Sequence, residues 1–122
     1  MTDLKLRTKR FALGILRLCR TLPHSEESRV LAKQLLRAGT SVGADYRAAC
    51  RARSRAEFVA KLGIVLEESD ETVFWLELMI EAGIGSNNKV APLMKEADEL
   101  TSIFVSSLRT AKERRDGFTI AS

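Results

Sequence analysis

The chain has 122 residues, 45% of them apolar and 30% charged, which is the composition of one soluble globular domain. No apolar run approaches the roughly 18 to 20 residues that span a bilayer, so membrane insertion is not expected. The formal net charge of +4 is unevenly placed, because basic residues dominate positions 1–55 and acidic residues dominate positions 56–100.

The residue types predict an all-α protein. Leu, Ala, Glu and Arg dominate, and no β-branched run is bounded by turn residues. Residues 1–23 are basic and partly apolar, but Arg17 and Arg20 interrupt the apolar part, which favours an amphipathic helix over an export signal. Cys19 and Cys50 are too few for a disulfide framework, so we expect reduced cysteines and a cytoplasmic location.

The first helix is expected over residues 3–21. Its apolar residues recur at helical spacing, which places them on one face: Phe11, Ile15, Leu18 and Leu22. Pro23 ends this helix, because the residue before a proline is disfavoured in the α region.

The second helix is expected over residues 26–52, with Ser25 as its N-cap. Its predicted inner face comprises Val30, Leu31, Gln34, Leu35 and Ala38. The following run 39–44, GTSVGA, has poor helix propensity and allows two interpretations. Either the helix breaks there, or it continues and its small residues let a neighbouring backbone approach closely. We favour a continuous helix, because strong helix formers resume at Tyr46 and no polar loop intervenes.

The third helix, residues 55–82, is the most strongly predicted element. Ser54 is the expected N-cap, with Glu57 three residues later, and Gly83 and Gly85 stop the helix. A heptad-like seam along it is expected to close the bundle: Phe58, Leu62, Val65, Ser69, Thr72, Leu76 and Met79.

The fourth helix is expected over residues 90–112, beginning near Lys89 or Val90 with Pro92 in its first turn, and the tail 113–122 is expected to be flexible. Four amphipathic helices with short connections predict a single domain over residues 1–122. Its expected architecture is an antiparallel up-down-up-down four-helix bundle.

Four runs of the chain resemble a family of small proteins called four helix bundle proteins. They are QLLRAGTSVGADYRAA at 34–49, RSRAEFVAKL at 53–62, EESDETVFWL at 67–76 and LMKEADEL at 93–100. The family was first noticed as open reading frames in intervening sequences of bacterial 23S ribosomal RNA genes, and the resemblance extends over about residues 11–112.

The resemblance implies a homo-oligomer, with pentameric rings known in the family. It also implies distant kinship to the accessory proteins of diversity-generating retroelements, which are pentameric and basic and bind nucleic acid and a reverse transcriptase. Self-association, RNA or DNA, and a reverse transcriptase or other protein are therefore the expected partners.

A second stripe on the third helix is the predicted oligomer interface: Ile64, Glu68, Glu71, Trp75 and Leu78. Phe74 and Trp75 are about 100° apart on a helix, so both cannot easily face one core. One interpretation has one ring in the core and the other partly exposed. The other has Trp75 packing against a second subunit, as large aromatic side chains often do at interfaces.

No catalytic or metal site is expected. The acidic run at Glu67, Glu68, Asp70 and Glu71 lacks the Glu-x-x-His elements of a di-iron bundle, and the single histidine, His24, lies in a loop. No phosphate-binding glycine pattern occurs. We therefore expect no cofactor and interpret the carboxylates as counter-charges for arginines of the same or a neighbouring subunit.

Basic residues cluster at the junction of the second and third helices, and these are the predicted nucleic-acid contacts: Arg47, Arg51, Arg53, Arg55 and Lys61. Two further clusters comprise Lys5, Arg7, Lys9 and Arg10, and Lys112, Arg114 and Arg115. No aromatic residues are interleaved with them, so any binding would be electrostatic and sequence-tolerant. The expected function is a non-enzymatic homo-oligomeric scaffold that binds RNA or DNA. The alternative is an interaction module whose charges serve assembly only.

Overall fold

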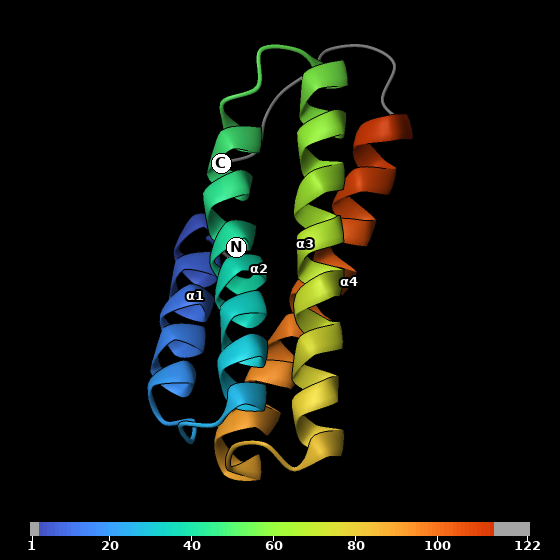
Figure 1. Ribbon diagram of the computed structural model, residues 1–122. Helices are drawn as coiled ribbons and strands as arrows, with labels where there is room; N and C mark the ends of the chain where they lie inside the picture. Colours follow the sequence, from blue (N-terminus) through green and yellow to red (C-terminus); the bar gives the residue numbers. More distant parts are fainter. Residues whose placement is uncertain (1–2, 114–122) are drawn as a thin grey trace.

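The computed structural model describes residues 3–113, which form four helices joined by short connections (Figure 1). The helices are α1 (Leu4–Arg20), α2 (Glu26–Cys50), α3 (Arg55–Ala82) and α4 (Asn87–Glu113). No strand occurs within residues 3–113, so the predicted all-α class is confirmed. The expected flexible tail falls mostly on residues 114–122, which lie outside the described residues, and Glu113 belongs to α4.

The helices form the predicted antiparallel bundle. Neighbours in sequence pack side by side, α1 on α2, α2 on α3 and α3 on α4, and a smaller contact between α1 and α4 closes the square. Within residues 3–113, no backbone contact joins α1 to α3 or α2 to α4, so these pairs occupy opposite corners. α1 has 17 residues against 25 to 28 in the others and does not reach the end of the bundle where α2 ends and α3 begins.

The helix ends follow the predicted capping chemistry. The Ser25 side chain accepts a hydrogen bond from the N–H of Ser28, and the Ser54 side chain accepts one from the N–H of Glu57. Each bond satisfies a backbone donor that lacks a partner within its helix. Gly83 terminates α3 with φ at +69°, a left-handed conformation in which a side chain would be strained.

α2 is continuous through Gly39 and Gly43, so the favoured interpretation is confirmed. Both glycines face α1. A Cβ atom at Gly39 would lie 3.0 Å from Cγ1 of Ile15, and one at Gly43 would lie 3.3 Å from Oγ1 of Thr8. The small residues therefore allow the α1 backbone to approach α2 closely.

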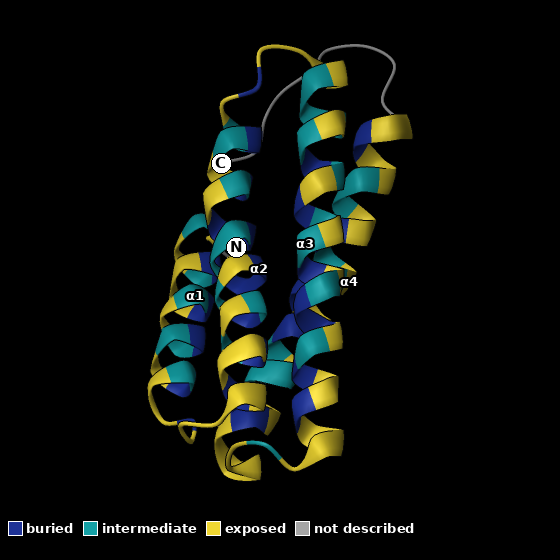
Figure 2. Cartoon of the chain, in the orientation of Figure 1, coloured by how far each residue is buried: buried dark blue, intermediate teal, exposed yellow. Residues whose placement is uncertain are grey.

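The predicted stripes form the core. The buried residues form one inward-facing band along the bundle (Figure 2), and the largest fully buried side chains include Phe104, Ile15, Leu35, Leu62 and Leu76. The inner-face assignment of Val30 was wrong, because that side chain is 56% exposed. Leu31, which was also predicted for the inner face, is buried, and its neighbour one step away on the helix points about 100° to the side.

Two helix boundaries differ from the prediction. α4 begins at Asn87 because the Ser86 carbonyl accepts hydrogen bonds from the N–H groups of both Lys89 and Val90, which places Pro92 beyond the first turn. α2 ends at Cys50 because the next two N–H groups bond to carbonyls three residues back rather than four. The early start of α4 shows that a proline does not always lie in the first turn of its helix.

Candidate self-association face and basic end

The predicted interface stripe lies along the edge where α3 meets α2, and we call this surface the α2/α3 face. Its members are Ile64, Glu67, Glu68, Glu71, Phe74, Trp75 and Leu78 from α3, with Val30, Arg37, Ser41 and Asp45 from α2. Phe74 is 55% exposed and Ile64 is 49% exposed, although both are large apolar side chains. The face is therefore an apolar surface with charged groups at its centre.

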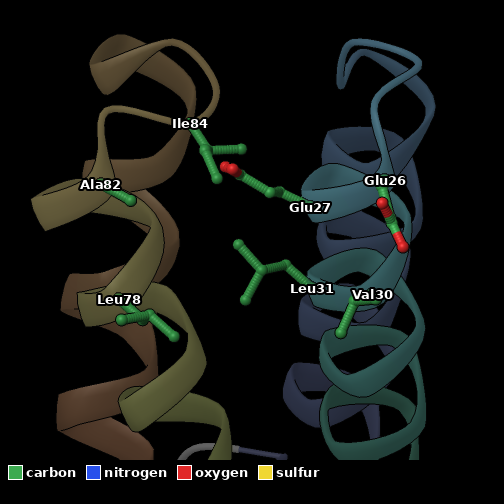
Figure 3. Close-up of a pocket in the computed structure, with 7 residues that line it drawn as sticks. All are labelled: Glu26, Glu27, Val30, Leu31, Leu78, Ala82 and Ile84. Carbon is green, nitrogen blue, oxygen red and sulfur yellow. The ribbon is translucent and has the colours of Figure 1, made fainter.

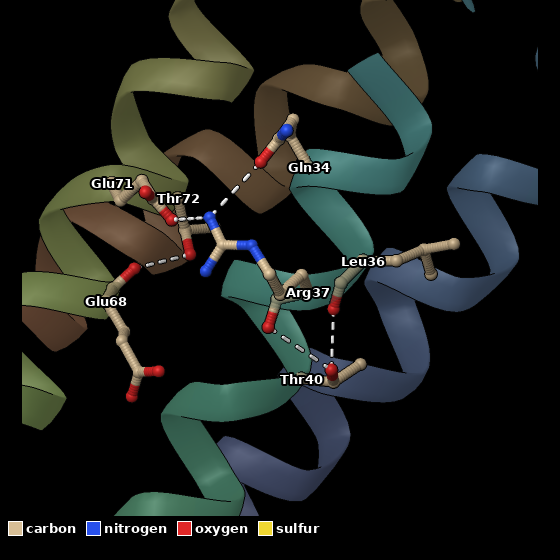
Figure 4. A network of polar contacts seen from close by, with 7 residues as sticks. All are labelled: Gln34, Leu36, Arg37, Thr40, Glu68, Glu71 and Thr72. Carbon is tan, nitrogen blue, oxygen red and sulfur yellow. Dashed lines mark hydrogen bonds and ion pairs between the residues drawn. The ribbon is translucent and has the colours of Figure 1, made fainter. Parts of the chain in front are cut away.

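An ion pair joins the two helices across this face (Figure 4). The Arg37 guanidinium on α2 donates hydrogen bonds to the Glu71 carboxylate on α3 and, at 3.2 Å, to the side-chain oxygen of Gln34. Glu71 thus has a partner within the same chain. The neighbouring Glu68 does not share it, since its carboxylate points away from Arg37. Among residues 3–113, an arginine ion pair therefore engages Glu71 but not Glu68.

One oxygen of the Glu68 carboxyl lacks a hydrogen-bond partner among the described residues. This oxygen, Oε1, is buried. Burial and the adjacent Asp45 carboxyl raise the pKa of Glu68 to about 8, against a smaller opposing effect of Ser41 and Arg37. The raised pKa favours the protonated form of the Glu68 carboxyl beside Asp45.

Trp75 carries the second unpartnered atom on this face. Its indole Nε1 is buried and has no hydrogen-bond acceptor within residues 3–113. Its ring packs edge-on against Phe74, with ring centroids 5.0 Å apart. Trp75 is half-buried while Phe74 projects outward, so these adjacent rings divide between the bundle and its surface. Buried indole N–H groups usually find a partner, but this atom is enclosed within the single chain, so a molecule on the surface cannot reach it without a rearrangement.

A shallow apolar groove of ≈ 420 Å³ continues the face toward the end of α3 (Figure 3). Leu31 points across it from α2, while Leu78 and Ala82 border it from α3. Ile84 and the side chain of Glu27 approach each other at its end. Sequence reasoning missed this groove, because it depends on the pairing of the α2 start with the α3 end.

The predicted basic cluster divides into free and engaged side chains. The side chains of Arg47, Arg51 and Arg53 are exposed and make no hydrogen bond or ion pair with residues 3–113. Arg55 instead donates to the carbonyl oxygens of residues 111 and 112, at 3.1 and 3.0 Å, and thereby caps the end of α4. The Nζ atom of Lys61 lies 3.5 Å from the carboxylate of Glu57, one turn earlier in α3.

The other two basic clusters also contain both engaged and exposed side chains. Arg7 donates two 2.7 Å hydrogen bonds to the carboxylate of Glu96 on α4, a bidentate pair that ties α1 to α4. Lys9 and Arg10 are exposed. Of the third cluster, Lys112 is exposed, and residues 114 and 115 lie outside the described residues.

Metal and membrane features were also assessed within residues 3–113. No group of three or more His, Cys, Asp or Glu side chains in this part of the chain is placed to hold a metal ion. None of its helices is both long enough and apolar enough to cross a bilayer.

Sequence comparison assigns the chain to a family. The profile of the family described as 23S rRNA-intervening sequence protein matches residues 3–106. The chain belongs to this family. A solved member is similar, a protein of unknown function from the S23 ribosomal protein family of Bacteroides thetaiotaomicron VPI-5482. The two share 34% identity and a TM-score of 0.81 over 88% of this chain and 99% of that one. Among curated proteins no match was found.

Proposed function

We propose that this 23S rRNA-intervening sequence protein is a non-enzymatic, homo-oligomeric scaffold of the cytoplasm. The observation that carries the proposal is the α2/α3 face, which exposes the large apolar side chains of Phe74, Ile64 and Leu78 around the Arg37–Glu71 ion pair. Contiguous exposed apolar surface marks interaction sites.

A second copy of the chain is the partner that the family resemblance favours, and a pentameric ring is the expected form. Repetition in a ring would also multiply any weak site through avidity. Arg47, Arg51 and Arg53 supply such a site, because they are exposed, unpaired and close in sequence at one end of the bundle. We propose that they contact phosphates of RNA or DNA, with a reverse transcriptase or another protein as a further partner.

The assembly proposal is tested with two matched substitutions. Phe74→Glu places a charge in the α2/α3 face, whereas Val105→Glu places one on a similarly exposed apolar position of α4, 40% exposed, outside that face. Light scattering should show an oligomer for the wild type and for Val105→Glu, and single chains for Phe74→Glu. Circular dichroism checks that both variants remain helical. An unchanged mass for Phe74→Glu contradicts the proposal.

The nucleic-acid proposal requires a separate experiment. Replacing Arg47, Arg51 and Arg53 together with Gln should abolish binding to a labelled RNA or DNA at low salt, where phosphate contacts are strongest. The control replaces three exposed basic residues of the opposite end, Arg20, Arg29 and Lys89, and has the same net charge. No binding by the wild type at low salt would favour the alternative, an interaction module whose charges serve assembly only.

A further inference from the structure

The outer side of α1 carries a regular stripe that the bundle does not use, and we call it the α1 face. Its members are spaced four, three and four residues apart and alternate in type: Leu6, Arg10, Leu13 and Arg17. All four are exposed. Neither Arg10 nor Arg17 makes a hydrogen bond or ion pair with residues 3–113, although Arg7 on the same helix is fully paired. The α1 face is therefore apolar and basic.

The α3 part of the α2/α3 face has the opposite charge and a similar period. Ile64, Glu67, Glu71, Phe74 and Leu78 are spaced three, four, three and four residues apart. Both stripes thus place apolar and charged residues together on one side of a helix at 3–4-residue spacing, which is the spacing that lets two helices pack along a seam. Arginines on one stripe match carboxylates on the other, and exposed leucines match exposed aromatic and aliphatic side chains.

The two stripes also lie at corresponding heights in the bundle. On α1, Thr8 packs against Gly43 of α2 and Ile15 packs against Gly39 of α2. On α3, Glu71 pairs with Arg37, which also belongs to α2. Ile15 and Glu71 therefore contact nearly the same turn of α2. In an up-down-up-down bundle α1 and α3 run in the same direction. A neighbour related by rotation about an axis along the bundle would keep this height, so Arg10 and Arg17 would flank the acidic turns of α3.

Since α1 and α3 occupy opposite corners, the two stripes lie on opposite sides of one chain. We propose that the α1 face of one copy binds the α2/α3 face of the next, a head-to-tail contact that closes into a ring; the inference rests on the proposed homo-oligomer. A symmetric contact of either face with itself would oppose like charges. Two α1 faces would bring arginines together, and two α3 stripes would bring Glu67 and Glu71 together, which is unfavourable. A contact between two different faces forms a closed ring when the repeated rotation from copy to copy returns to the first copy.

Matched pairs of exposed residues test this assignment. Leu13 on α1 is 39% exposed and Val105 on α4 is 40% exposed; Leu78 on the α2/α3 face is 38% exposed and Ile80 at the other side of α3 is 39% exposed. Glutamate at Leu13 or Leu78 should reduce the assembly to single chains of 13.6 kDa in light scattering. Glutamate at Val105 or Ile80 should leave the wild-type mass. Arg10→Glu with Arg17→Glu is a second α1-face variant that introduces no charge at an apolar position.

Mixing two defective variants then separates head-to-tail from symmetric contacts. The Leu13→Glu chain keeps an intact α2/α3 face and the Leu78→Glu chain keeps an intact α1 face. Together they should form a 1:1 dimer of twice the 13.6 kDa chain mass and nothing larger. Three results would overturn the α1-face assignment while the homo-oligomer stands. They are a wild-type mass for both Leu13→Glu and Arg10→Glu/Arg17→Glu, dissociation of a control variant, and the absence of a dimer in the mixture. A wild-type chain that is itself monomeric would instead overturn the proposed function.

Discussion

The substitution Gly39→Ala tests how closely α1 and α2 pack. Alanine is favoured over glycine inside a helix by about 1 kcal/mol, so the change would stabilise α2 if space allowed. The added Cβ, however, would lie 3.0 Å from Cγ1 and 3.2 Å from Cγ2 of Ile15, which is fully buried. Those atoms lie next to the α1 backbone and cannot rotate away freely. Overpacking of a core costs about 1 to 3 kcal/mol, so we expect a net loss of about 1 kcal/mol.

Two other glycines within helices supply the controls. Gly63 in α3 has no atom within 4 Å of an added Cβ, so Gly63→Ala should stabilise the chain by about 0.5 to 1 kcal/mol. Gly43 is intermediate, since its nearest neighbours are Oγ1 of Thr8 at 3.3 Å and the Thr8 backbone at 3.4 Å. The free energy of unfolding of Gly43→Ala should therefore lie between those of the other two variants.

Urea denaturation measures all three variants against the wild type. One protein concentration is needed throughout, because self-association makes the apparent stability depend on concentration. The expected order of stability is Gly63→Ala, Gly43→Ala, Gly39→Ala. If Gly39→Ala were as stabilising as Gly63→Ala, the close approach of α1 to α2 would be refuted.

Three further substitutions probe single interactions. In the folded chain the pKa of Glu68 is raised from its ordinary 4.5 to about 8. The stabilisation from protonated Glu68 is therefore complete below pH 4.5 and is lost as the pH rises through 8. Between pH 5 and 9 the free energy of unfolding should therefore fall less for Glu68→Gln than for the wild type. The expected difference, reduced for solvent screening, is about 1 kcal/mol. Arg55→Ala should increase hydrogen exchange in the last turn of α4, whose carbonyls it caps. Ser54→Ala should lower the free energy of unfolding by about 1 kcal/mol through loss of the α3 N-cap.

The helices of this protein can be predicted from the sequence because several signals agree at each element. α3 has a serine cap, an apolar period and a glycine stop, and all three appear in the structure. α4 was placed less accurately, because Pro92 indicates a first turn by preference only and the Ser86 carbonyl starts the helix earlier. Helix boundaries depend on such backbone bonds, which residue types specify weakly.

The surfaces were harder to predict than the core. The second stripe of α3 was visible in the sequence, but the Asp45 carboxyl beside Glu68 was not, because that contact depends on how α2 and α3 are rotated toward each other. The same holds for Arg55, which clustered with other arginines in the sequence but caps α4 in the structure. A charge cluster read along the chain does not reveal which members are already paired.

We propose that another copy of the chain covers the α2/α3 face, and the mass of the intact wild-type protein in solution tests this most directly. Light scattering coupled to gel filtration should give a single species with a mass several times the 13.6 kDa of one chain. A species of 13.6 kDa that persists as the protein concentration is raised would contradict this proposal, because Phe74, Ile64 and Leu78 would then stay exposed to solvent.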